Sequence, residues 1–182
     1  MLELSSPTPG LLFGSFLYRA DLHSPQDLKE KWEKTFGAHF EFSPEFNPLA
    51  QYYADEMGPK ETLHRFFVIS TLTFPREKLL EAKLMAQEWE LEWAQNSKRS
   101  VNLDIGFLTL ENFTLATSKN YSHRIYLGQN IFSDLTYQFQ HGEFQTLPWT
   151  YPDYADEKKK EFFTWARIYL LTLLTRSKNP GT

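Results

Sequence analysis

Charged side chains interrupt the apolar alternation of several strand-like segments between Arg99 and Tyr154. Three of these side chains have the types needed for acid–base chemistry, namely Asp104, His123 and Asp134. A half-buried histidine beside a carboxylate can act as a base or an acid near neutral pH. Such a pair can instead fix the register of a sheet, because buried polar groups need hydrogen-bond partners in any case. We predict His123 and Asp134 as the pair for any proton transfer, with the structural role as the alternative.

A second group of residues is basic and lies at or near the ends of predicted strands: Arg65, Arg99, Lys119 and Arg124. Arginine can bind phosphate or carboxylate through two parallel hydrogen bonds, so convergence of these side chains would create an anion site. The alternative is pairing with local acids, Arg65 with Glu56 or Glu61, and Arg124 with Asp104 or Asp134. Acids outnumber bases in the chain by 23 to 19, which favours this alternative.

Two aromatic clusters lie on segments rich in proline and glycine, YYADEMG at residues 52–58 and WTYPDY at residues 149–154. Aromatic rings beside an aspartate can line a ligand cleft or form a platform on which a nucleobase stacks. Tyrosine and tryptophan also seal the edges of sheets, with their polar atoms reaching water. Both interpretations remain open for these clusters.

Several families of enzyme are excluded by missing motifs. The chain has no Gly-x-x-x-x-Gly-Lys-[Ser/Thr], no Gly-x-Gly-x-x-Gly and no Gly-x-Ser-x-Gly, which excludes P-loop nucleotide hydrolases and disfavours α/β-hydrolases. It has no cysteine, which excludes disulfides and thiolate metal sites. The 5 histidines are scattered, so we predict no metal site, although His123 with Asp104 and Asp134 is a conceivable mixed set. No cofactor follows from the sequence, and it leaves open whether the chain catalyses a reaction.

The composition indicates a well-packed protein with a weak negative charge. The 182 residues are 41% hydrophobic and 16% aromatic, enough for a core without covalent staples. A net charge of -4 disfavours binding to duplex nucleic acid, which needs a basic face. The N-terminus lacks the basic region of a secretory signal, and its apolar run at residues 11–17 is far shorter than a membrane span. We therefore expect a cytoplasmic protein with no membrane segment.

The elements that position these residues follow from the spacing of apolar side chains. Strands are predicted at residues 11–18, 38–42 and 64–73, and helices at residues 25–36 and 75–95. Residues 43–60, with Pro44, Pro48 and Pro59, are predicted as one long loop. Further strands are predicted at residues 100–108, 123–127, 131–139 and 143–147, followed by a helix at residues 156–176.

This order predicts an α+β fold. A ferredoxin-like β-α-β-β-α-β unit comes first, followed by a β-meander and a final helix, in a mainly antiparallel sheet. Both early helices should cover one face of that sheet, because crossovers are right-handed. We expect a disordered lead at residues 1–10, a single domain at residues 11–176 and a frayed tail at residues 177–182.

Four stretches carry a family resemblance: FGAHFEFSPEF, YYADEMG, RSVNLDIGFLTLENFTLATSKNYSHRIYLG and LPWTYPDY. Together they resemble the bacterial family DUF4416, a domain of unknown function, over nearly the whole chain. The resemblance implies recurring polar positions that include Glu56, Arg65, Asn102 and Thr136. The chain departs from the family pattern at Phe107, where the family commonly has tyrosine, and at Asp134, where it has glutamate.

We predict that the sheet and loops form a cleft that binds a small anionic ligand, for which a nucleotide-like molecule is one candidate. The predicted ligand residues are Glu56, Arg65, Arg99, Asn102, Asp104, Lys119, Arg124, Trp149, Tyr151 and Asp153. A rival hypothesis is a protein-interaction module, for example a homo-oligomer, that uses its sheet edge and aromatic loops. A concave site lined by converging polar groups would favour the ligand hypothesis.

Overall fold

The computed structural model describes residues 5–43, 50–96 and 98–178, so parts of the predicted lead and tail, and part of the predicted loop, lie outside the described residues. The elements, in chain order, are β1 (Gly10–Arg19), α1 (Pro25–Phe36), β2 (His39–Phe42), α2 (Ala50–Met57), η1 (Lys60–Thr62), β3 (Leu63–Phe74), α3 (Lys78–Trp93), β4 (Val101–Leu108), β5 (Asn112–Thr117), β6 (Ile125–Gly128), β7 (Ile131–Gln140), β8 (Glu143–Thr146), η2 (Pro152–Tyr154) and α4 (Glu157–Lys178). None of the described helices is both long and apolar enough to cross a membrane.

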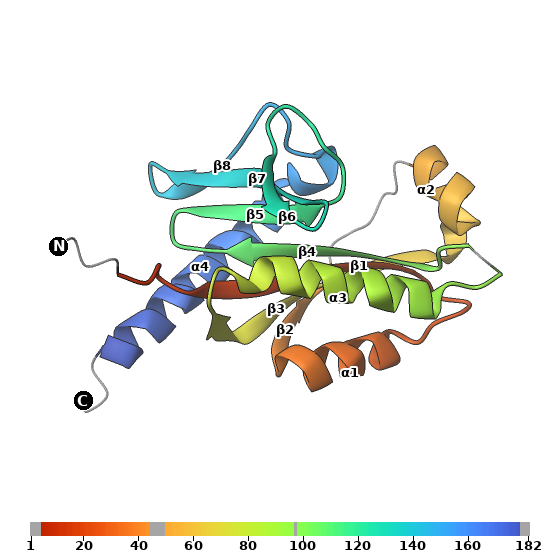
Figure 1. Ribbon diagram of the computed structural model, residues 1–182, viewed down its shortest axis with the longest axis horizontal. Helices are drawn as coiled ribbons and strands as arrows, with labels where there is room; N and C mark the ends of the chain where they lie inside the picture. The colour runs from red at the N-terminus through yellow and green to blue at the C-terminus, as the bar shows by residue number, and fades with distance from the viewer. Residues whose placement is uncertain (1–4, 44–49, 97, 179–182) are drawn as a thin grey trace.

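The fold is α+β, and its sheet is antiparallel throughout the described pairs. Within the described residues the strands form one 8-stranded sheet of order β2-β3-β1-β4-β5-β7-β6, with β8 added to β7 (Figure 1). The first half of this order is that of a ferredoxin-like unit, and the meander continues it from β4. The predicted fold class is confirmed.

Helices α1 and α3 cover one face of the sheet (Figure 1). Ser24 caps α1 by accepting a hydrogen bond from the Gln26 N–H at 3.2 Å, and Gly37 ends the helix with a φ of 80°. Trp32 of α1 is fully buried against Phe16 of β1. Burial of a side chain of this size stabilises the fold by roughly 2–3 kcal/mol, so this face forms one of the two main cores.

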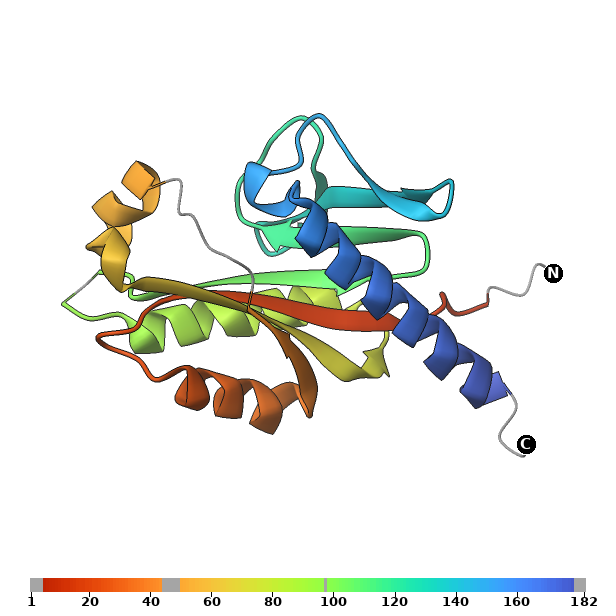
Figure 2. The ribbon, with the colours of Figure 1, turned by 180° about the vertical axis from the view of Figure 1, so that it is seen from behind.

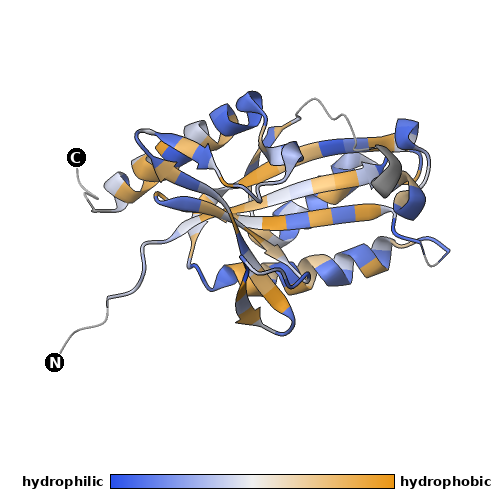
Figure 3. Cartoon of the chain, turned by 90° about the horizontal axis from the view of Figure 1, so that it is seen from above, coloured by the Kyte–Doolittle hydropathy of each residue, from blue (hydrophilic) through white to orange (hydrophobic). Residues whose placement is uncertain are grey.

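Helix α4 crosses the opposite face of the sheet (Figure 2). Its fully buried Phe163 contacts Phe13 of β1 and Phe113 of β5, with ring centroids 5.2 and 4.2 Å apart. Polar and apolar residues alternate along part of the sheet, as the colours of Figure 3 show, whereas β1 is buried over most of its length. Helices cover both faces of the sheet. A polar side chain on either face is therefore buried in a hydrophobic core unless the covering elements leave a gap above it.

Such a gap opens beside β4. Strand β5 pairs with residues 105–108 of β4, so residues 101–104 extend beyond the end of β5 (Figure 1). Two side chains of α3 bind the backbone there: Lys83 Nζ donates to the Leu103 carbonyl at 3.1 Å, and the Leu103 N–H donates to Glu90 Oε1 at 2.7 Å. A backbone group left without a partner at this partly buried edge would cost about 1–3 kcal/mol. The two side chains of α3 avoid this cost by taking the place of a neighbouring strand.

Three sequence predictions of local structure were wrong. The predicted loop at residues 43–60 contains α2, whose residues 50–57 have no proline and whose Met57 packs against Leu17 and Leu63. Strand β5 was not predicted, although Phe113 and Leu115 alternate with polar residues and are buried. Strand β6 begins at Ile125 and not at residue 123, because residues 121–124 form a turn closed by a 3.0 Å backbone hydrogen bond.

Candidate functional site

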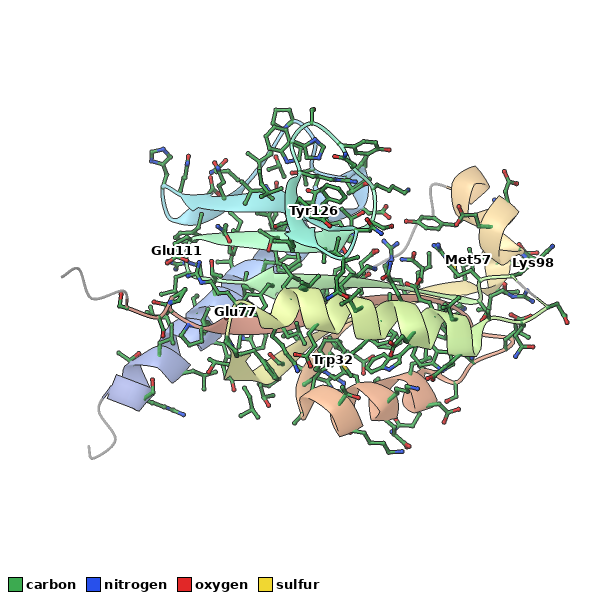
Figure 4. The ribbon with its side chains drawn as sticks, in the orientation of Figure 1. Trp32, Met57, Glu77, Lys98, Glu111 and Tyr126 are labelled. Atoms are coloured by element: carbon green, nitrogen blue, oxygen red, sulfur yellow. The ribbon has the colours of Figure 1, made fainter. Side chains whose placement is uncertain are left out.

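A cleft of about 470 Å³ lies where β4 extends beyond β5. Its walls come from α2, α3, β4, β5, the loop at residues 117–124 and the segment at residues 151–154. Met57, labelled in Figure 4, marks the end of α2, which contributes Tyr53 and Glu56 to the lining. The predicted site residues among its lining are Glu56, Arg65, Arg99, Asn102, Asp104, Lys119, Arg124, Asp134, Tyr151 and Asp153. Cavities of this size hold small molecules in many proteins.

Arg124 organises the wall formed by the 117–124 loop. Its Nε donates to Asp134 Oδ2, its Nη1 to the Lys119 carbonyl and its Nη2 to the Tyr151 hydroxyl, each at 2.8 Å. Its guanidinium also lies 4.4 Å from the ring centre of Tyr121. The side chains of Arg124 and Asp134 are only 1% and 3% exposed, so this ion pair is internal to the wall. It is one of the local pairings that the sequence left open.

His123 and Asp134 lie close together, but the histidine is outside the cleft lining. His123 Nε2 is 3.4 Å from Asp134 Oδ2, the oxygen that also accepts from Arg124. The imidazole stacks on Trp149 with ring centres 4.9 Å apart, and the Trp149 indole N–H donates to the Leu135 carbonyl at 2.8 Å. Among the described residues, neither His123 nor Trp149 lines the cleft. The arrangement fixes the position of the 147–151 segment against β7.

Arg65 of β3 forms the floor of the cleft. Its Nη1 donates to Asp153 Oδ2 at 2.7 Å, and its side chain is 2% exposed. The ring of Tyr53 lies 6.0 Å from the guanidinium. Burial, and then the nearby Asp104 carboxylate, raise the pKa of Tyr53 to about 12, so its hydroxyl stays protonated at neutral pH. The partner of Arg65 is therefore Asp153, whereas the sequence suggested Glu56 or Glu61.

A chain of polar contacts links α2 to β4 across the mouth of the cleft. Arg99 Nη1 lies 3.5 Å from Glu56 Oε2 and donates to Asn102 Oδ1 at 2.8 Å. The Asn102 amide in turn donates to Asp104 Oδ1 at 3.2 Å. Arg99 and Glu56 are exposed, whereas Asn102 and Asp104 are half-buried. These contacts tie the entrance of the cleft to its floor.

Sequence reasoning missed the contribution of α3 to the cleft. Lys83, Gln87 and Glu90 line it, and their spacing of four and three residues places them on one face of the helix. Burial raises the pKa of Glu90, opposed by Lys83 and by the Leu103 N–H. The usable signal was Lys83 itself, a lysine among the buried positions Leu79, Ala82 and Ala86.

The charges of the cleft lining are balanced. The acids Glu56, Glu90, Asp104, Asp134 and Asp153 equal in number the bases Arg65, Lys83, Arg99, Lys119 and Arg124. Among the residues that the structure describes, no three histidine, aspartate or glutamate side chains are grouped closely enough to hold a metal ion, His123 with Asp104 and Asp134 included. The cleft can therefore offer hydrogen bonds and charges of both signs to an organic molecule.

This geometry defines an α+β protein with a polar cleft at the place where β4 extends beyond β5. A family model described as "Domain of unknown function (DUF4416)" matches residues 8–169, and the chain belongs to that family. The family resemblance read from the four sequence stretches is confirmed. A search of curated proteins and a search of solved structures each found nothing similar to the chain.

Proposed function

We propose that this chain binds a small anionic organic ligand, with a planar ring as in a nucleotide, in the cleft beside β4. The observation that carries the proposal is convergence: polar side chains from segments far apart in the sequence line one cavity of about 470 Å³. Residues that only stabilise a fold seldom leave such a space between them, because interiors are close-packed. This concave geometry is the one that favours ligand binding over a flat interaction surface.

The preference for an anion rests on which charges reach the mouth of the cleft. Of the exposed charged residues in the lining, Arg99 and Lys119 are basic and Glu56 is acidic, so bases are in excess there and can turn toward a bound phosphate or carboxylate. Two of the acids are engaged deeper in the walls, Asp134 with Arg124 and Asp153 with Arg65. The planar ring would lie against tyrosine, because Tyr53, Tyr121 and Tyr151 are all part of the lining.

The proposed function is binding and not proton transfer by His123. Asp134 accepts from buried Arg124, and His123 stacks on Trp149 away from the cleft lining. A general base must reach the proton that it removes, directly or through one water. Ligand contacts are therefore assigned to Arg99, Lys119 and the tyrosines, with Arg65 and Arg124 holding the walls in place.

Isothermal titration calorimetry with AMP, phenyl phosphate and inorganic phosphate tests this function. AMP and phenyl phosphate should bind more tightly than inorganic phosphate, since the latter lacks a ring. Arg99→Gln and Lys119→Gln should each weaken binding of AMP by about 2–5-fold, the size expected for one exposed charge. Lys34→Gln, which removes a charge from the exposed surface of α1, is the matched control and should leave binding unchanged. Absence of binding by all three probes would contradict the proposal.

A second candidate function, protein interaction, is favoured by the surface of β6. This strand ends the strand order and, among the described residues, pairs with β7 alone. Its Ile125 and Tyr126 are 69% and 59% exposed. An uncovered apolar edge can pair with a strand of another molecule, including a second copy of the chain. Light scattering of the wild type and of Ile125→Lys would show a concentration-dependent dimer that the substitution abolishes.

A further inference from the structure

Asp104 is the acid of the cleft that has neither a salt bridge nor a backbone N–H donor among the described residues. Its one hydrogen bond to them comes from the Asn102 amide, at 3.2 Å to Oδ1. Glu90 accepts the Leu103 N–H at 2.7 Å. The remaining acids of the lining each lie within ion-pair distance of an arginine: Glu56, Asp134 and Asp153. Asp104 and Arg65 attract each other, but Arg65 donates a hydrogen bond to Asp153, so Asp104 keeps acceptor capacity for a ligand.

Asp104 lines the cleft from β4. It lies on the same face of the sheet as Ser15, its partner on β1, and it is half-buried. Burial first and then the Asp104 carboxylate raise the pKa of both Tyr53 and Tyr154, so two tyrosine hydroxyls lie within its electrostatic reach. Oδ2 of Asp104 accepts no hydrogen bond from the described residues. A carboxylate can accept about four hydrogen bonds, so Asp104 can accept further donors from a ligand.

We infer that Asp104 binds an amino or amidine N–H group on the planar ring of the ligand. This inference rests on the proposed function, because it assigns a residue of the same cleft. A carboxylate accepts N–H donors from amino-substituted heterocycles, as it does from the amino group of cytosine. Arg99 and Lys119 would then hold the anionic group, while Asp104, which Asn102 links to Arg99, accepts the amino group of the ring. The ligand class is an anionic molecule whose ring carries an exposed amino group.

The balance of charge in the lining supports this assignment. A ligand with anionic groups alone would meet Asp104, and like charges at close range disfavour binding. A ligand with an N–H donor near Asp104 removes that repulsion and donates a hydrogen bond to its carboxylate. The cleft should therefore discriminate between ligands that differ only in this amino group.

Two matched pairs of nucleotides test the inference by calorimetry. AMP differs from purine riboside 5′-monophosphate by its amino group alone. CMP differs from UMP by an amino group in place of a carbonyl, which repels a carboxylate, and by an N3 acceptor in place of an N3–H donor. The wild type should bind the amino-bearing member of at least one pair about tenfold or more tightly than its partner. Asp104→Asn, which is isosteric, should reduce this preference to within about threefold.

Controls separate this inference from the proposed function. Asp27→Asn makes the same change on exposed α1, on the far face of the sheet, and should keep the preference of the wild type. Equal affinity of the wild type for both members of each pair, or a preference that survives in Asp104→Asn, overturns the role of Asp104 and leaves binding in the cleft intact. No binding by any of the nucleotides overturns the role of Asp104, and if phenyl phosphate and inorganic phosphate also fail to bind, the proposed function is overturned with it. The comparison within the wild type remains decisive if Asp104→Asn does not fold.

Discussion

The buried ion pair between Arg124 and Asp134 should contribute strongly to the stability of the cleft wall. Asp134→Asn removes one charge without changing the size of the side chain and leaves the guanidinium buried with two neutral acceptors, the Lys119 carbonyl and the Tyr151 hydroxyl. Loss of one partner of a buried pair costs about 3–5 kcal/mol, and the remaining acceptors place this variant near the lower value. For a chain of this length a loss of about 3 kcal/mol lowers the melting temperature by about 6–12 °C.

Equilibrium unfolding in urea, followed by tryptophan fluorescence, measures this free energy. Arg124→Met should also destabilise the fold, and the double variant should lose at least about 2 kcal/mol less than the sum of the two single variants. Asp21→Asn breaks the exposed Arg19–Asp21 pair and should cost less than about 1 kcal/mol. If Asp134→Asn costs no more than this control, or if the single effects simply add, the ion pair does not stabilise the wall as argued.

Three further predictions concern the rest of the fold. Burial lowers the pKa of His23 and His39 in the folded state, so the unfolded chain binds more protons than the folded chain as the pH falls through about 6.5. The free energy of unfolding should therefore fall between about pH 7.5 and 5.5. The double variant His23→Asn with His39→Asn should show a smaller fall over this range. Glu90→Ala should cost about 1–3 kcal/mol in urea unfolding because the Leu103 N–H loses its acceptor, whereas Glu90→Gln keeps an acceptor and should cost less. Ser24→Ala should cost about 1 kcal/mol, read from the melting temperature, through loss of the α1 cap.

Much of the fold could be predicted because its signals are local. Helix α1 carries Leu28, Trp32 and Phe36 at helical spacing, and all three are buried. Strand β4 alternates so that Val101 and Leu103 face α3 while Asn102 and Asp104 face the cleft. Strand β5 was missed because it follows β4 without an obvious turn motif. Such strands depend on their neighbours in the sheet more than on their own composition.

The composition of the cleft could be predicted only in part. Polar residues that break the apolar alternation of strands did point to the cleft, because a polar side chain on a buried face needs a reason to be there. Which acid pairs with which base could not be read from the sequence. Arg65 pairs with Asp153, which is 88 positions away, and only the topology of the sheet brings the two together. The contribution of α3 to the cleft could not be predicted either, because it depends on how the helix packs against the sheet.

The binding of the Leu103 backbone by Lys83 and Glu90 has an evolutionary consequence. These two side chains line the cleft, yet their hydrogen bonds replace a strand that β5 is too short to provide. A longer β5 would pair with Leu103 directly, and Lys83 and Glu90 would no longer be needed to bind the Leu103 backbone. Within the family, the residues that correspond to Lys83 and Glu90 should therefore vary together with the length of β5, whereas a residue that selects the ligand, such as Asp104, should vary independently of it.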